Sequence, residues 1–329
     1  MLLISESDLK EALTMGDVIQ AVCGAFRDYS EGQVHVPARR ISMDIRGTTN
    51  SSIFLAANYF SIPYYGIKHA CSFPGNKGRG MDTVLSDIHL YSAETGKLLA
   101  LISANHLTAM KTGAAAAVAT DVLAKTGDTV LAIIGTGVQA QTQLEAIQLV
   151  RPLSGVKLYN RSPHRAEEFA AYVETVKNRD YPVMVCRSAD ECVADAGVVC
   201  TATTSLTPVF SGDCLAEDAH VNAVGSFTPA MQEIDTRTVV RAAKVVTDNR
   251  EESWAVAGDL LVPLREGAIT HSKIYGELGD IVSGKIPGRE DAREITIYES
   301  VGFAALDVAV AAEAYHKARA LHLGTHTDW

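Results

Sequence analysis

A glycine-rich loop in the stretch TVLAIIGTGVQAQTQ, residues 129–143, separates an apolar run from a helix-like segment. Its spacing, Gly135-x-Gly137-x-x-Ala140, is the pattern that receives the pyrophosphate of a dinucleotide. The first glycine makes the turn, the second lets the backbone approach the phosphates, and the alanine permits close helix packing. The helix N-terminus then offers N–H donors. We therefore predict dinucleotide binding, rather than a purely structural turn, through Gly135, Thr136, Gly137, Val138 and Gln139.

The end of the next strand, in KLYNRSPHR, bears on which dinucleotide fits. An NAD site usually has Asp or Glu at this point, which accepts a hydrogen bond from the ribose 2′-hydroxyl. This sequence instead offers Asn160, Arg161, Ser162 and Arg165. Two arginines without a carboxylate can pair with a 2′-phosphate. The sequence predicts a preference for NADP(H) and leaves NAD(H) possible, because a solvated basic helix start is the alternative.

A lysine inside an apolar strand is the second feature that could do chemistry. Lys68 lies in YGIKHA, and a lysine is seldom buried without a task. Its ammonium could bind a carboxylate or, with a pKa lowered by burial, supply a proton to a nitrogen atom. A lysine that reaches solvent from a strand edge is the alternative. His69 should face the opposite side of a regular strand, where packing or an interface is the expected role.

Composition and charge narrow the partners. The chain has 329 residues, 47% of them hydrophobic, which is enough for one or two full cores. The formal net charge of −10 argues against nucleic acid as a partner. No run of 18 apolar residues is present, so a membrane-spanning helix is not expected. The expected partner is a small molecule.

Motif searches for metal and export signals are negative. The six cysteines form no CxxC pair and the ten histidines no HExxH motif, so we expect reduced thiols and no metal site. The start, MLLISESDLKEAL, has neither the basic region nor the long apolar region of a signal peptide. Together these features favour a cytoplasmic protein.

The elements that must position these residues fall into two groups. Residues 5–32 have helical periodicity, 36–103 read as strands broken by turns, and 105–124 form a helix rich in small residues. From residue 128 strands alternate with helices, which predicts an α/β fold with a doubly wound parallel sheet of the Rossmann type. The last helix, within 302–324, should return to the first domain. We predict an α+β domain of residues 1–115 plus 303–329 and a dinucleotide domain of residues 116–302.

Several ordered motifs together resemble the ornithine cyclodeaminase/mu-crystallin family. They are VPARR, GIKHA, TAMKTGAAAAVAT, NAVGSFTPAMQEID, GELGDIVSGK and ESVG, and they extend nearly from end to end. The resemblance implies hydride transfer between a nicotinamide and an α-imino or α-amino acid. It also implies a homodimer, built by the first domain with the last helix, and an active site in the cleft between the domains.

The resemblance also implies roles for individual residues. Arg39 in VPARR and Lys68 match the family's carboxylate-binding arginine and active-site lysine. Lys111 stands where most members have arginine, so a charge is kept but the bidentate fork is lost. With Lys68 and Arg39 it forms the expected catalytic set. Further expected contacts to substrate come from Thr83, Ser226 and Asp307, and to the cofactor from Thr201, Ala202, Gly225, Ser226, Ser300 and Gly302.

One departure from the family pattern separates the possible reactions. Cyclodeaminases carry an aspartate that takes protons from the side-chain amine, and Phe227 occupies that place here. A phenyl ring accepts no proton, so ring closure loses its base. We therefore predict NAD(P)H-dependent reduction of Δ1-pyrroline-2-carboxylate to L-proline. The alternatives are an iminosuccinate reductase, an alanine-dehydrogenase-like enzyme, a true ornithine cyclodeaminase, and a non-catalytic mu-crystallin-like protein that holds NADPH and a small ligand.

Overall fold

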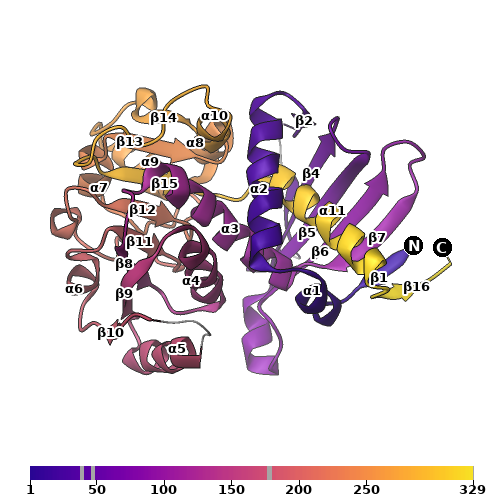
Figure 1. Ribbon diagram of the computed structural model, residues 1–329, viewed down its shortest axis with the longest axis horizontal. Helices are drawn as coiled ribbons and strands as arrows, with labels where there is room; N and C mark the ends of the chain where they lie inside the picture. The colour runs from indigo at the N-terminus through magenta and orange to yellow at the C-terminus, as the bar shows by residue number, and fades with distance from the viewer. Residues whose placement is uncertain (38–40, 46–48, 176–179, 329) are drawn as a thin grey trace. The chain divides into compact units, whose positions relative to one another are not determined.

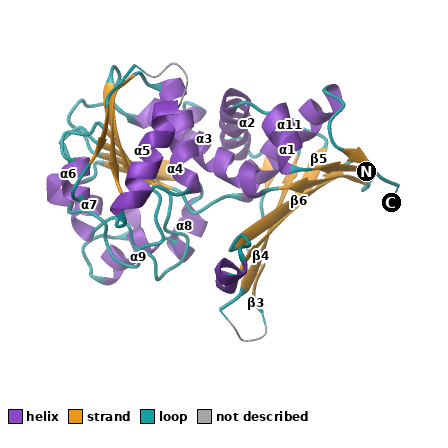
Figure 2. Cartoon of the chain, turned by 90° about the horizontal axis from the view of Figure 1, so that it is seen from below, coloured by secondary structure: helices purple, strands orange, loops and turns teal. Residues whose placement is uncertain are grey.

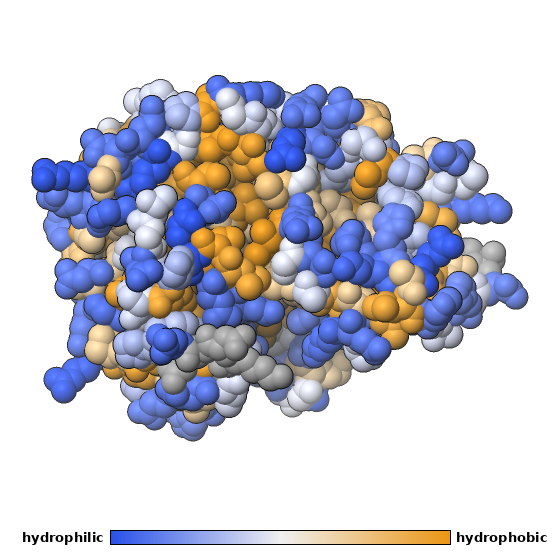
Figure 3. Space-filling view, in the orientation of Figure 1, coloured by the Kyte–Doolittle hydropathy of each residue, from blue (hydrophilic) through white to orange (hydrophobic). Residues whose placement is uncertain are grey.

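The computed structural model describes residues 1–329 apart from 38–40, 46–48, 176–179 and 329. The chain divides into two compact units, shown in Figure 1: unit 1 comprises 1–111 with 303–329, and unit 2 comprises 112–302. The division falls inside helix α3, Asn105–Leu123. Hydrophilic residues cover much of the outer margin of the face in Figure 3.

Two helices open unit 1, α1 (Glu6–Ala12) and α2 (Met15–Ser30). Each begins with a capping box, in which the Ser5 or Thr14 hydroxyl accepts an N–H from the aspartate three residues on. The continuous helical pattern of residues 5–32 is thus divided, because Thr14 caps a second helix. A single helix, the simplest reading of that pattern, would be wrong.

An eight-stranded mixed sheet forms the rest of unit 1, as far as the chain is described. Its order is β16-β1-β7-β6-β5-β4-β2, with β3 paired to β4. Helix α11 (Ala304–Ala320) packs on β4, β5 and β6 and beside α2, and Figure 2 shows these helices on one face of the sheet. The strands are β1 (Leu2–Ile4), β2 (Val34–His35), β3 (Ile41–Asp44), β4 (Ser51–Tyr59), β5 (Tyr64–Ser72), β6 (Val84–Ser92), β7 (Leu98–Ser103) and β16 (Thr325–His326), with a 3₁₀ turn at Pro74–Arg79.

Unit 2 contains a fully parallel sheet in the order β10-β9-β8-β11-β12-β15-β13-β14. The strand order reverses between β8 and β11, and this switch point is where doubly wound folds bind ligands. The predicted α/β fold is confirmed. The strands are β8 (Thr129–Ile134), β9 (Leu153–Tyr159), β10 (Val183–Val185), β11 (Val198–Thr201), β12 (His220–Ala223), β13 (Lys244–Thr247), β14 (Ile274–Glu277) and β15 (Thr296–Glu299).

Helices cover both faces of the unit 2 sheet, as Figure 2 shows for α4 and α5 on one side and α6 and α7 on the other. Alternate residues of each strand enter two separate cores, so that Leu131 and Ile133 lie in one and Ala132 and Ile134 in the other. The helices are α4 (Val138–Val150), α5 (Pro163–Thr175), α6 (Ala189–Val193), α7 (Thr236–Arg241), α8 (Arg250–Val256), α9 (Gly258–Arg265) and α10 (Leu278–Val282), with 3₁₀ turns at Gly212–Cys214 and His271–Lys273.

Within the described ranges, no helix has both the length and the apolar character needed to cross a membrane.

Candidate active site

The two glycines of the dinucleotide loop, residues 135–140, have different reasons to be glycine. Gly135 has a φ of +91°, and a Cβ there would lie 2.6 Å from the carbonyl oxygen of Ala202. It is therefore required by the close approach of the loop that follows β11. A Cβ on Gly137 would meet no atom of the described chain within 4 Å. The open space beside Gly137 fits a ligand that comes close to the backbone.

Helix α4 begins at this loop without help from a capping side chain. Its N-cap is Gly137, which offers no side-chain acceptor to the first turn. Ala140 is fully buried, as close packing of the helix against the sheet requires, and Val138 is 71% exposed. Uncapped N–H groups at the switch point of a parallel sheet suit a pyrophosphate.

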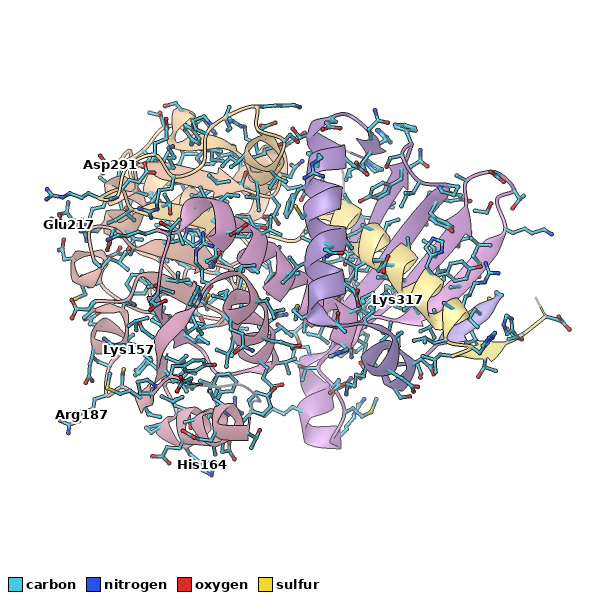
Figure 4. The ribbon with its side chains drawn as sticks, viewed as in Figure 1. Lys157, His164, Arg187, Glu217, Asp291 and Lys317 are labelled. Carbon is cyan, nitrogen blue, oxygen red and sulfur yellow. The ribbon has the colours of Figure 1, made fainter. Side chains whose placement is uncertain are left out.

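Polar side chains brace this loop against the turn after β9. Asn160 Nδ2 donates to Thr136 Oγ1 at 2.8 Å, and Thr136 Oγ1 donates to the Arg165 carbonyl oxygen at 3.1 Å. The Ser162 N–H donates to Asn160 Oδ1 at 3.0 Å. The Asn160 and Thr136 side chains, which we expected to face the cofactor, thus hold each other. Arg161 and the Arg165 side chain are exposed, as is the neighbouring His164, whose side chain points outward in Figure 4.

A buried cluster of charges lies in unit 1, and we call it the cation cluster: Lys68, Lys111 and Asp307. The Asp307 Oδ1 atom lies 3.0 Å from Lys68 Nζ and 2.7 Å from Lys111 Nζ. The side chains are 5%, 5% and 1% exposed. Two ammoniums share one carboxylate oxygen, so one positive charge is in excess. Such a cluster is a ready receptor for one more carboxylate.

Three elements bring these side chains together. Lys68 lies on β5, where it pairs with Leu55 and Ile88. Asp307 lies in the first turn of α11. The helix comes this close because β5 carries Gly66, whose Cβ would already lie 3.0 Å from Val308 Cγ2. Lys111 comes from α3, where it is buried.

Burial and charge oppose each other inside the cation cluster. Burial lowers the pKa of Lys68 to about 8, while the charge of Asp307 raises it and that of Lys111 lowers it. Burial raises the pKa of Asp307, but the two ammoniums outweigh this effect, so the net pKa is lower than usual. Asp307 therefore stays ionised, and Lys68 can exchange a proton near neutral pH.

Other residues predicted for the substrate lie elsewhere. Arg39 is outside the described residues. Thr83 is exposed directly before β6, five residues from the partner of Lys68 on that strand. His69 faces away from Lys68, as predicted, with its Nδ1 3.1 Å from Asp87 Oδ2 and its Nε2 2.8 Å from Ser52 Oγ.

The hydroxyls predicted for the cofactor in unit 2 already have protein partners. Thr201 Oγ1 donates to Glu233 at 2.9 Å, Ser226 Oγ to the Met231 carbonyl at 3.0 Å, and Ser300 Oγ to Asp248 at 3.0 Å. Thr201 and Ser226 are fully buried. The Gly302 N–H also donates to Asp248, at 3.0 Å. The hydroxyl protons of these three side chains thus bond within the protein, and the backbones of Ala202 and Gly225 lie directly after β11 and β12.

Four buried carboxyl groups were not predicted from the sequence. Glu233, Asp248, Asp259 and Glu299 are fully buried in unit 2. Burial raises the pKa of Glu233, of Asp259 to about 8, and of Glu299 well above its ordinary value. The available signal was an acid at the end of an apolar strand, as in ITIYE. Among the described residues, no group of acids, histidines or cysteines could hold a metal ion.

The fold and these two sites are of the kind found in nicotinamide-dependent oxidoreductases. The chain belongs to the ornithine cyclodeaminase/mu-crystallin family, whose model matches residues 1–321. The resemblance predicted from the sequence motifs is confirmed.

Among relatives, the chain is 37% identical to the Δ1-pyrroline-2-carboxylate reductase of Bacillus cereus, over 97% of each chain. The structure of the Thermococcus litoralis Δ1-pyrroline-2-carboxylate reductase with NADH and L-proline has a TM-score of 0.95 at 35% identity, covering 99% of this chain and 100% of that one. An archaeal alanine dehydrogenase, a dimer with bound NAD, has a TM-score of 0.93 at 31% identity, covering 100% and 99%.

Proposed function

We propose that this chain reduces Δ1-pyrroline-2-carboxylate to L-proline with NAD(P)H. The observation that carries the proposal is the cation cluster, which holds one uncompensated positive charge within a family of dinucleotide-dependent enzymes. The substrate has one carboxylate beside a C=N bond, so a single excess charge matches it. The relatives named for this reaction, from Bacillus cereus and Thermococcus litoralis, support the choice of ring size.

In this mechanism the cation cluster binds and orients the imino acid. The substrate carboxylate pairs with the ammoniums of Lys68 and Lys111, while Asp307 holds both lysines at the correct spacing. When bound, the reduced nicotinamide supplies a hydride to the imine carbon. The nitrogen must be protonated for the C=N bond to become C–N, and we propose that the Lys68 ammonium, whose pKa burial lowers to about 8, supplies that proton. The products are the amino acid and the oxidised dinucleotide.

A substrate panel tests the proposal. Δ1-pyrroline-2-carboxylate, the six-membered piperideine homologue, iminosuccinate, and pyruvate with ammonia are each assayed with NADH and NADPH. We expect the highest kcat/KM for the five-membered ring, and no ammonia from ornithine with NAD⁺ because Phe227, 47% exposed after β12, offers no base. Faster turnover of pyruvate with ammonia would instead favour the alanine-dehydrogenase alternative, and faster turnover of iminosuccinate would favour a dicarboxylate substrate.

The catalytic efficiency, kcat/KM, should fall as the pH rises above neutral. Because the pKa of Lys68 is lowered to about 8, its ammonium is lost as the pH rises through that value, and both carboxylate binding and proton supply fail. We expect kcat/KM to fall about tenfold per pH unit above this point, while the Kd for NADPH stays level. In Lys68→Arg the cation persists at every assay pH but cannot supply a proton, so we expect a lower kcat/KM that no longer falls near pH 8. An unmoved fall in that variant would contradict the assignment.

We further propose a preference for NADPH, which rests on the exposed Arg161 and Arg165 and on Asn160 in place of an acid. Arg161→Ala with Arg165→Ala should raise the Kd for NADPH about tenfold to a hundredfold, because two charge-assisted contacts to a 2′-phosphate are lost. The Kd for NADH should change less than twofold. Fluorescence titration measures both values, and an equal loss for the two dinucleotides would contradict the preference.

We also propose a homodimer. The sheet face opposite Lys68 carries Ile41, Met43, Ile67 and Leu85, which are 36–60% exposed. Exposed apolar side chains on a sheet face are typical of an interface, and the archaeal alanine dehydrogenase is a dimer. Sedimentation should give twice the chain mass of 35.1 kDa. We also propose a cytoplasmic location, because the six cysteines show no spacing typical of a disulfide framework.

A further inference from the structure

Two separate polar networks hold the loops at the carboxyl edge of the unit 2 sheet. The first, through Asn160 and Thr136, ties the loop after β8 to the turn after β9. The second surrounds the fully buried side chain of Glu233 and involves the loops after β11 and β12. In a doubly wound fold, the strands on the two sides of the switch point bind the two halves of a dinucleotide.

The Glu233 carboxylate accepts three hydrogen bonds from residues at the end of, or directly after, strands β11 and β12. Thr201 Oγ1 and the Gly225 N–H donate to Oε2 at 2.9 and 2.7 Å, and the Thr203 N–H donates to Oε1 at 2.5 Å. Gly225 must be glycine for this, because a Cβ would lie 2.6 Å from the Glu233 carboxyl carbon. A carboxylate can satisfy all three donors at once, and no neutral side chain of the same shape can.

The backbone of Glu233 is itself fixed. Asp259 Oδ1 accepts the N–H groups of Glu233 and Ile234 at 2.6 and 2.9 Å, and the Val209 N–H donates to the Glu233 carbonyl oxygen at 2.8 Å. The side chain therefore has little freedom to follow a moving loop. Its contacts set the spacing between the loops after β11 and β12 rather than adapting to it.

We infer that Glu233 is a positioning residue for the nicotinamide half of the dinucleotide. It shapes the β11 and β12 loops, while the Asn160 network serves the adenosine half. This inference rests on the proposed dinucleotide-dependent function. Weakening the Glu233 network should therefore reduce the affinity for the nicotinamide half of the cofactor and leave the affinity for the adenosine half unchanged.

The test compares a whole cofactor with a fragment that lacks nicotinamide. In Glu233→Gln one acceptor becomes a donor that faces an N–H group, so we expect the Kd for NADH and NADPH to rise about tenfold or more. The Kd for ADP-ribose, measured by calorimetry, should stay within about twofold. A purely structural role would weaken all three ligands alike, and an equal loss, or none, overturns the inference.

Two further variants keep the test decisive. Thr201→Val removes one donor without changing side-chain volume, and it should give a smaller loss of the same selectivity even where Glu233→Gln folds poorly. Glu299→Gln changes a neighbouring buried carboxyl, which no described donor contacts, and it should leave all Kd values unchanged. If the wild type binds no dinucleotide, the proposed function fails. If the wild type binds the dinucleotide and reduces the imino acid, and Glu233→Gln has the same Kd values as the wild type, only this inference fails.

Discussion

Lys68→Met should lower kcat/KM for the imino acid by at least about a thousandfold while leaving the Kd for NADPH within about twofold. The substitution removes the excess positive charge, because Lys111 and Asp307 remain as a neutral pair. Truncating one partner of a buried, hydrogen-bonded charge pair across a binding interface costs about 2–5 kcal/mol of binding free energy. Losing a general acid lowers the rate by a further factor of about 10²–10⁴. Steady-state kinetics and fluorescence titration measure the two quantities.

The matched control is another lysine–aspartate pair in the same unit. Lys317, on α11 and labelled in Figure 4, lies 2.7 Å from Asp17 and has a side chain 36% exposed. Lys317→Met should keep full turnover, because an exposed pair contributes little and lies outside the cation cluster. Turnover that survives in Lys68→Met, or that is lost equally in both variants, would remove Lys68 from the site.

Folding of Lys68→Met should not be the reason for lost activity. The lowered pKa of Lys68 means that the folded protein binds this proton less tightly than the unfolded chain does. The charged form therefore opposes folding below pH 8, and this penalty fades as the pH rises toward the ordinary lysine value. Methionine keeps the volume and removes the charge, so we expect a melting temperature at pH 7 no lower than that of the wild type.

Much of the fold could be predicted from local sequence patterns. Alternation of strands with helices after residue 128 predicted the parallel sheet. Glycine spacing located the loop at Gly135, because a turn with a φ of +91° favours glycine. Lys68 stood out because a charge within an apolar strand is unusual at the level of a few residues. These signals depend on near neighbours in the chain, so they can be seen without coordinates.

Contacts between residues far apart in the sequence could not be predicted. Lys68 and Asp307 are 239 residues apart, and no periodicity in either segment indicates that they share a hydrogen bond. Neither Glu233 nor Glu299 was predicted to have a role, because a carboxylate is usually solvated. The donors that surround Glu233 come from the ends of other strands, which only the fold brings together. Family resemblance pointed to Asp307 but did not reveal that it holds both lysines.

Substitutions at the two loop glycines should have different effects, one on stability and the other on dinucleotide binding. Gly135→Ala should lower the melting temperature by several degrees, because alanine at a φ of +91° is strained by about 1–3 kcal/mol and its methyl would meet the Ala202 carbonyl. Differential scanning calorimetry measures the shift. Little or no change in melting temperature would mean that the β11 loop yields at no cost.

Gly137→Ala has the opposite expected profile. Its backbone, with a φ of −88°, accepts alanine without strain, and no described atom lies within 4 Å of the added methyl, so the melting temperature should change by less than about 1 °C. The same methyl would occupy the space that the phosphates need, so the Kd for NADPH should rise at least about tenfold. An unchanged Kd in a well-folded Gly137→Ala would mean that the dinucleotide does not bind at this loop, and the function proposed for the cation cluster would then lack its hydride source.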